Sequence, residues 1–220
     1  MQTKDLSLYH IIRPSKFQDD KPPVLFLFHG YGSNEEDLFS FAAELPEQLC
    51  IIAVRAPHNI MVPNAYAWYS INFDSTDGKW SDEKQAAESR DAIGNFIVEA
   101  CNTYGLDEEN VSILGFSQGA ILSYALALSF PEKIKNVIAL SGYVLEGILT
   151  EGYKEKDHRK LAVYTSHGTM DDVIPLQWAQ RAPGLLKSLG ISHDYQEFPI
   201  GHGVSPQNFY AFKTWLEQKI

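Results

Sequence analysis

The sequence predicts an α/β fold, in which a mostly parallel central sheet is flanked by helices. Three observations lead to this prediction. Strand-like and helix-like segments alternate along the chain, as in parallel β-α-β units. Residues 24–28 (Val-Leu-Phe-Leu-Phe) are continuously apolar, as expected for a strand buried on both faces. A Gly-rich turn at 115–119 separates a short apolar run from a long Ala/Leu-rich one. At 220 residues without a repeat or linker, the chain is expected to form a single domain spanning 1–220.

The first part of the chain supplies four predicted elements. Residues 6–12 (Leu-Ser-Leu-Tyr-His-Ile-Ile) alternate in the way typical of an edge strand in a hairpin. Residues 23–28 form the central strand. Ser33 to Glu36 has the pattern of a capping box, so a helix is expected from there to Glu44. Residues 49–54 (Leu-Cys-Ile-Ile-Ala-Val) are the next buried strand.

The second part continues the alternation. A long amphipathic helix is expected from Ser81, its N-cap, to Tyr104, and Gly105 ends it. Apolar runs predict strands at 111–114, 135–140, 161–166 and 192–198, and helices at 120–128, 178–189 and 206–219. The long connections at 56–80 and 141–160 are too short to form a separate helical cap domain over the sheet.

Residues 115–119 (Gly-Phe-Ser-Gln-Gly) form a G-x-S-x-G pentapeptide between a predicted strand and a predicted helix. In that context the pentapeptide forms a nucleophile elbow, a sharp turn that holds its serine in a strained backbone conformation and lifts the hydroxyl above the sheet. Gly115 and Gly119 are needed because a larger side chain would collide with the neighbouring strand or helix. Ser117 is therefore the candidate nucleophile.

A serine hydroxyl needs a base, and in hydrolases with this elbow the acid and then the histidine follow the serine in the chain. Four histidines lie downstream of Ser117. His158 lies in a charged stretch and is expected at the surface, His193 lies within a predicted strand, and His167 opens the segment that carries the candidate acids. His202 lies on a Gly-flanked loop after the last strand, from which it can reach the end of the strand before Ser117. His202 is the expected base.

The candidate acids are Asp171 and Asp172, which follow the strand at 161–166. Because they are adjacent, only one can face the histidine. The structural alternative for each is a turn or helix-capping aspartate, and we favour that role for Asp172.

These motifs together resemble the carboxylesterase/phospholipase branch of the α/β-hydrolases, which includes bacterial carboxylesterases and eukaryotic acyl-protein thioesterases. The branch carries an H-G-x-G loop, G-F-S-Q-G at the elbow, an H-G-x-x-D turn and a late loop histidine. Here these are residues 29–32, 115–119, 167–171 and 201–202, in the same order and across nearly the whole chain. The resemblance implies the α/β-hydrolase fold, Asp171 as the acid and, by analogy, a homodimer.

An oxyanion hole is expected beside Ser117. One donor is the backbone amide of Gln118, at the N-terminus of the elbow helix, where amides are unpaired. The resemblance indicates the amide of Tyr31 as the other donor. His29 is expected to brace its loop and has no catalytic role.

The segment 56–80 is rich in aromatic residues: Tyr66, Trp68, Tyr69, Phe73 and Trp80. Two interpretations stay open. The segment forms a wall of the acyl pocket, with Trp68 and Tyr69 as the substrate-binding residues, or it is a packed loop whose aromatics cover the edge of the sheet. Without a cap domain the site is expected to be shallow and open, which favours short or medium acyl groups.

The composition of the chain limits the kinds of partner that the protein is expected to bind. A formal charge of −10 argues against nucleic acid and against tight adhesion to an anionic membrane. No apolar stretch approaches the roughly twenty residues that cross a bilayer, and the first residues lack the apolar core of a signal peptide. We therefore expect a cytoplasmic protein without stable membrane insertion. Cys50 and Cys101 occupy apolar positions and are expected to be buried free thiols.

The sequence thus predicts a serine hydrolase that cleaves small carboxylic esters through an acyl-enzyme, with no metal or organic cofactor. Its activity should rise with pH over roughly pH 6–7.5, as a histidine base loses its proton. Thioesters or lysophospholipids are alternative substrates, since the chemistry of the site would be the same. A non-catalytic binding protein of the same fold is the third possibility, although such proteins typically lose a member of the triad and this chain has all three.

Overall fold

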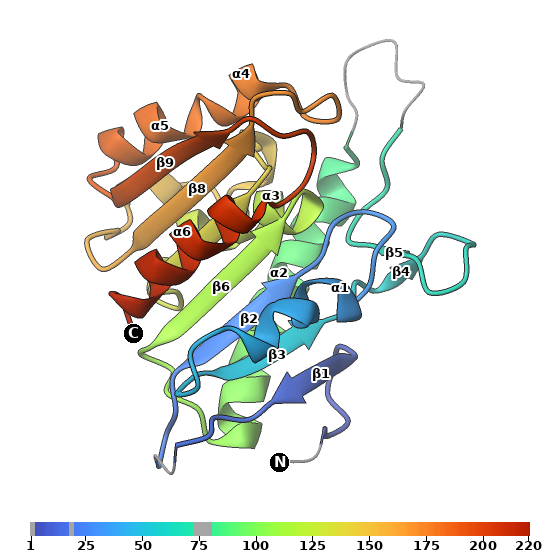
Figure 1. Ribbon diagram of the computed structural model, residues 1–220, viewed down its shortest axis with the longest axis vertical. Coiled ribbons are helices and arrows are strands. Elements are labelled where there is room, and N and C mark those ends of the chain that lie inside the picture. The colour runs from blue at the N-terminus through green and yellow to red at the C-terminus, as the bar shows by residue number, and fades with distance from the viewer. Residues whose placement is uncertain (1–2, 18–19, 73–80) are drawn as a thin grey trace.

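The computed structural model describes residues 3–17, 20–72 and 81–220. Its centre is a seven-stranded sheet with the strand order β1-β3-β2-β6-β7-β8-β9 (Figure 1). β1 pairs with β3 antiparallel, and the other neighbours in this sheet are parallel. The predicted α/β architecture with a mostly parallel sheet is confirmed.

The strands of this sheet are β1 (His10–Arg13), β2 (Val24–Phe28), β3 (Cys50–Val54), β6 (Val111–Phe116), β7 (Asn136–Leu140), β8 (Ala162–Gly168) and β9 (Ser192–Phe198). A small hairpin consists of β4 (His58–Asn59) and β5 (Tyr66–Ala67). The helices are α1 (Glu36–Phe39), α2 (Glu83–Tyr104), α3 (Gln118–Ser129), α4 (Leu176–Ala179), α5 (Ala182–Ser188) and α6 (Pro206–Glu217). Short 3-10 turns occur at Ser40–Ala43, Glu146–Ile148 and Tyr153–Glu155.

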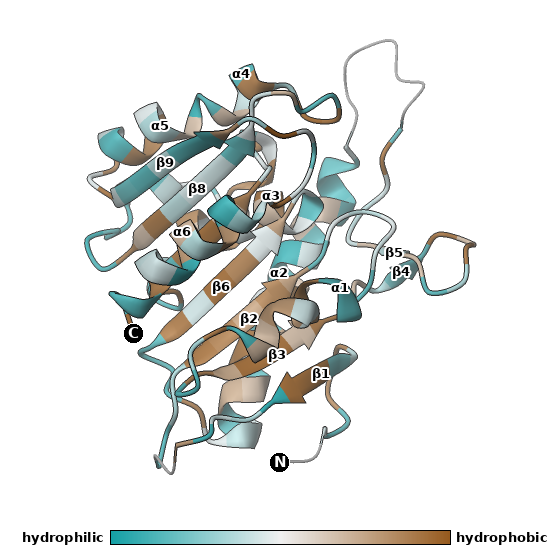
Figure 2. Ribbon diagram, in the orientation of Figure 1, coloured by the Kyte–Doolittle hydropathy of each residue, from teal (hydrophilic) through white to brown (hydrophobic). Residues whose placement is uncertain are grey.

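Helices cover both faces of the sheet. On one face, α2, α3 and α5 cover a core that contains Val24, Phe26 and Phe28 of β2 and residues of the other strands. On the other face, α1 and α6 pack against Leu25 and Leu27. Alternate residues of β2 thus enter opposite cores, which explains why its sequence is continuously apolar. Figure 2 shows this hydrophobic centre and the hydrophilic edge strand β9.

The parallel strands set the position of the candidate site. β2, β6, β8 and β9 run in one direction, so their carboxyl ends meet at one edge of the sheet. The loops that carry His29, Ser117, Asp171 and His202 all leave from this edge, where sheets of this type bind their ligands.

The N-terminal predictions need two corrections. The first strand begins at His10 instead of Leu6 and pairs with β3, so it is an edge strand but not half of a hairpin with β2. The predicted capping box at Ser33 does not form, because a bridge to Tyr66 holds the Ser33 backbone. The Ser33 hydroxyl donates instead to Asp37 (2.8 Å), and the helix expected up to Glu44 is one α-helical turn followed by a 3-10 turn.

Two other helices differ from their predicted bounds. α2 is capped by Asp82, whose side chain accepts from the amide of Gln85 (3.0 Å), and not by Ser81. The end at Gly105 is confirmed, since Gly105 is left-handed with φ 67°. The helix expected at 178–189 is broken into α4 and α5, because Pro183 lacks the N–H that a continuous helix would use.

None of the helices in the described residues has both the length and the apolar character needed to cross a membrane.

Candidate active site

The G-x-S-x-G turn has the predicted geometry. Ser117 lies between β6 and α3 with φ 54° and ψ −115°, a conformation that L-residues rarely adopt. The glycines permit this turn. A Cβ atom at Gly115 would lie 2.2 Å from the carbonyl oxygen of Gly119, and one at Gly119 would lie 2.0 Å from the carbonyl oxygen of Phe28. The start of α3 can therefore pack this closely on the strands only because both positions are glycine.

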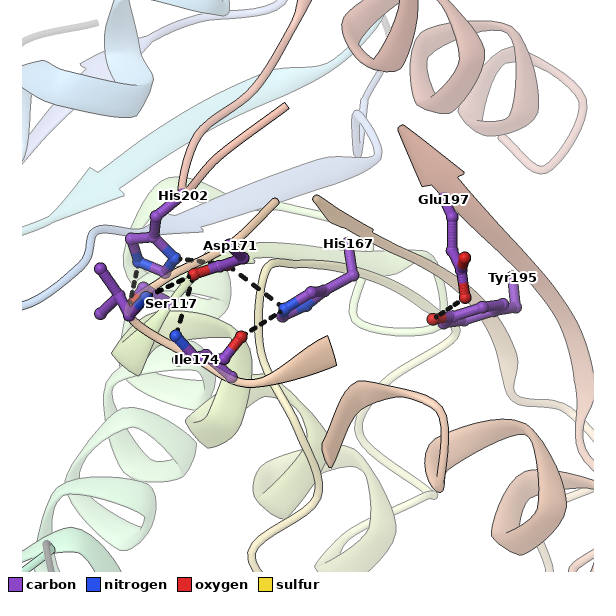
Figure 3. A network of polar contacts seen from close by, with 8 residues as sticks. Ser117, His167, Asp171, Ile174, Tyr195, Glu197 and His202 are labelled. Atoms are coloured by element: carbon purple, nitrogen blue, oxygen red, sulfur yellow. Dashed lines mark hydrogen bonds and ion pairs between the residues drawn. The ribbon is translucent and has the colours of Figure 1, made fainter. Parts of the chain in front are cut away.

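His202 and Asp171 lie beside this turn (Figure 3). The Nε2 atom of His202 is 3.0 Å from Ser117 Oγ, and its Nδ1 atom is 2.7 Å from Asp171 Oδ2. The imidazole packs on the ring of Phe116, with centroids 4.9 Å apart. Such a chain can activate a serine hydroxyl, because the carboxylate orients the imidazole and stabilises its charged form.

The turn after β8 holds the acid rigidly. Asp171 Oδ1 accepts hydrogen bonds from the amides of Val173 and Ile174, both at 2.9 Å. His167 Nε2 lies 2.9 Å from the carbonyl oxygen of Ile174 and 3.2 Å from Asp171 Oδ2. The Asp171 side chain is fully buried, whereas Asp172 is exposed. Of the two candidates, Asp171 is the aspartate that the fold brings to His202.

The remaining histidines lie elsewhere. His193 is half-buried, with Nδ1 3.0 Å from the carbonyl oxygen of Ile191. His158 is buried and its Nε2 is 3.3 Å from the carbonyl oxygen of Leu128, so the expected surface position is wrong. Its charged neighbours predict exposure, but the ring turns inward to the carbonyl end of α3.

His29 is buried and braces its own loop, as predicted. The amide of Ala56 donates to His29 Nε2 (3.0 Å), so the ring proton is on Nδ1, which donates to the carbonyl oxygen of Gly30 (2.7 Å). Burial lowers the pKa of His29 and keeps it neutral.

The two segments expected to form an oxyanion hole flank Ser117. Gln118 is the first residue of α3, where backbone amides lack partners within the helix. A Cβ atom on Gly30 would lie 3.3 Å from Ser117 Cβ, so the loop 29–32 packs directly against the elbow. Tyr31 follows Gly30 in this loop, and its side chain is partly exposed.

The aromatic segment packs inward. Trp68 is 0% and Tyr69 is 1% exposed, so neither side chain can contact a substrate, and their prediction as pocket-wall residues is wrong. The packed-loop alternative describes them better. Phe73 and Trp80 lie outside the described residues.

Sequence reasoning overlooked several side chains around the triad. Phe116 packs on the imidazole although its position in the pentapeptide gave it no role, and His167 contacts the acid turn. Met170 and Val173, which flank Asp171, are apolar yet 63% and 61% exposed. Their closeness in sequence to Asp171 is the only signal that could have indicated them.

Comparisons with known proteins show the family to which the chain belongs. Residues 11–220 match the phospholipase/carboxylesterase family. A probable carboxylesterase of Oryza sativa subsp. japonica is 24% identical over 169 residues, which is 76% of this chain and 62% of that protein. Acyl-protein thioesterase 1 of Saccharomyces cerevisiae is 29% identical in an alignment that covers 94% of this chain and 96% of that protein.

The fold has a solved counterpart. The crystal structure of the Bacillus cereus carboxylesterase superposes with a TM-score of 0.82 at 21% identity, covering 97% of this chain and 95% of that one. The chain spans 55–62% of the length of three plant carboxylesterases that it matches. Because the match to the family extends over nearly the whole chain, the protein belongs to the phospholipase/carboxylesterase family of α/β-hydrolases.

Proposed function

We propose that the protein is a serine hydrolase that cleaves carboxylic esters through an acyl-enzyme. One observation carries the proposal: Ser117, His202 and Asp171 form a continuous chain of contacts of 3.0 and 2.7 Å at the carboxyl edge of the sheet. Membership of the phospholipase/carboxylesterase family supports it.

The reaction has two steps. Ser117 Oγ attacks the ester carbonyl while His202 Nε2 takes its proton, and Asp171 holds the imidazole and stabilises its charge. The backbone amides of Tyr31 and Gln118 bind the oxygen on which negative charge develops. His202 then protonates the leaving alcohol, and a water molecule, activated by the same histidine, releases the acid.

Short to medium acyl chains are the proposed substrates. The described connections form only a small hairpin and helical turns above the sheet, with no helical cap. Met170 and Val173 belong to the same turn as Asp171, and their exposed apolar side chains are available to an acyl chain. Thioesters are the second candidate, because the similar yeast protein is named an acyl-protein thioesterase. The same triad would act, with a thiolate as the leaving group.

The test is hydrolysis of p-nitrophenyl esters from acetate to palmitate by wild type and by Ser117→Ala. We expect activity that peaks at short or medium chains and is lost in the variant. A parallel series of acyl thioesters with matched chains decides between ester and thioester. A fluorophosphonate probe should label wild type and not Ser117→Ala. Folded wild type that neither cleaves an ester nor takes the label would contradict the proposal and favour a binding protein.

A further inference from the structure

Residues 66–69 connect the two segments that flank the nucleophile. The indole N–H of Trp68 donates to the carbonyl oxygen of His29 (2.9 Å), at the start of the loop that carries Tyr31. The backbone amide of Trp68 donates to Gln118 Oε1 (2.9 Å), and Gln118 Nε2 donates to the carbonyl oxygen of Tyr69 (2.7 Å). Trp68 is therefore bonded to both proposed oxyanion segments at once.

These bonds lie in the protein interior. Trp68 and Gln118 are 0% and 2% exposed, and His29 is 1% exposed. The indole packs edge-on against Phe28, with centroids 5.7 Å apart, and lies tilted by 35° against the His29 ring, with centroids 5.5 Å apart. Because water does not reach these groups, a lost partner would leave a buried polar atom unsatisfied, so the geometry is held tightly.

The residue types match the bonding pattern. The end of the Gln118 side chain must accept from one amide and donate to a carbonyl, and a neutral carboxamide does both. A glutamate could not donate, and a methionine could do neither. The indole of Trp68 similarly offers a single donor on a large apolar body, which fills the core while its N–H reaches His29.

An oxyanion hole works only when its donors are spaced to meet one oxygen atom, and its two donors here come from segments far apart in the sequence. We propose that Trp68 and the side chain of Gln118 are positioning residues that set the spacing between the amides of Tyr31 and Gln118. This inference rests on the proposed function. Neither side chain touches the substrate, and both act through the backbone they hold.

Two variants and one control test the inference. Trp68→Phe removes the indole donor and keeps an aromatic ring, and Gln118→Met removes both side-chain bonds while leaving the backbone amide. The control is Tyr164→Phe. Tyr164 is also fully buried, and its hydroxyl donates to Asn208 Oδ1 (3.3 Å), but it lies in the core on the other face of the sheet from Trp68.

We expect kcat to fall about tenfold in each test variant, less than the hundredfold or more for loss of an oxyanion donor itself. KM should change little. Affinity for a trifluoromethyl ketone, whose adduct with serine places an oxyanion in the hole, should fall by the same factor as kcat/KM. The pH profile should stay unchanged, because His202 and Asp171 are not touched. Tyr164→Phe should stay within about twofold of wild type.

Three results would overturn the inference. Wild-type kcat and ketone affinity in folded Trp68→Phe would do so. An equal loss in Tyr164→Phe would also do so, since the loss of any buried hydrogen bond would then explain the effect. Thermal unfolding shows which variants are folded. If Gln118→Met does not fold, the result for Trp68→Phe alone decides the test. Wild type that neither cleaves esters nor reacts with fluorophosphonate would overturn the proposed function as well, whereas active wild type with unaffected variants overturns only this inference.

Discussion

Gly119 offers a sharp test of how the elbow is built, because the same substitution can be made at another helical glycine. A Cβ atom at Gly119 would lie 2.0 Å from the carbonyl oxygen of Phe28 and 2.9 Å from that of His29. At Gly184, in α5, a Cβ atom meets nothing within 4 Å. Alanine favours a helix over glycine by up to about 1 kcal/mol, so Gly184→Ala should stabilise the protein slightly.

The cost at Gly119 follows from these distances. Real Cβ contacts essentially never fall below 3.0 Å, so the helix start and the end of β2 must separate by about 1 Å. Both are backbone segments in the centre of the fold, and overpacking of this kind costs about 3 kcal/mol. The displaced carbonyls lie at the end of β2 and at the start of the loop that leads to Tyr31. A shift of about 1 Å at a catalytic group can lower kcat about 100-fold.

The free energy of unfolding is measured by urea denaturation, and kcat by hydrolysis of a short p-nitrophenyl ester. We expect Gly119→Ala to lower the free energy of unfolding by about 3 kcal/mol and kcat by about 100-fold. Gly184→Ala should lower neither. If Gly119→Ala unfolds within about 0.5 kcal/mol of wild type and keeps its activity, the tight packing of the elbow on β2 is refuted.

Three further predictions concern the acid, the thiols and a buried ion pair. Asp171→Asn should lower kcat by roughly 10³–10⁴-fold, because the amide favours the wrong imidazole tautomer; steady-state kinetics that show a loss below tenfold would contradict its role. Burial raises the pKa of Cys50 and Cys101 to about 12, so Ellman's reagent at pH 8 should not react with the native protein and should titrate both thiols after unfolding. Burial acts to raise the pKa of Glu35, but the hydrogen bonds from Arg55 outweigh it and hold the pKa below its usual value. The unfolded chain then binds the proton more tightly, so this stabilisation is present at neutral pH and disappears as the pH falls through about 4. In urea denaturation, Glu35→Gln should have a lower free energy of unfolding than wild type at pH 7, and this difference should shrink as the pH is lowered to 3. A difference that stays constant with pH would exclude this linkage.

The parts of the site that could be predicted are those with local causes. The strained turn at Ser117 depends on two glycines and on the strand and helix around it, and all of these are visible within a short stretch of sequence. The central strands are recognisable because burial on both faces demands an uninterrupted apolar run. The order of the motifs, together with the resemblance, led to His202 and Asp171, and the fold places both beside Ser117.

The predictions that the structure contradicts failed for non-local reasons, with one exception. The box at Ser33 is lost to a bridge with Tyr66, a residue of another segment. His158 turns into the interior because the carbonyl end of α3 lies beneath it. The break between α4 and α5 is the exception, since Pro183 is a visible signal that the apolar pattern overrode.

By itself the sequence determined the fold class, the strand-turn-helix at the nucleophile and the order of the candidate groups, because backbone sterics and hydrophobic periodicity act over a few residues. Only the tertiary structure decided that Trp68 and Tyr69 are buried instead of lining a pocket, and that His158 is buried instead of exposed. Both outcomes depend on hydrogen bonds and packing between segments far apart in the chain. The bond from the Trp68 indole to His29 is one of them, because its donor follows β5 and its acceptor follows β2.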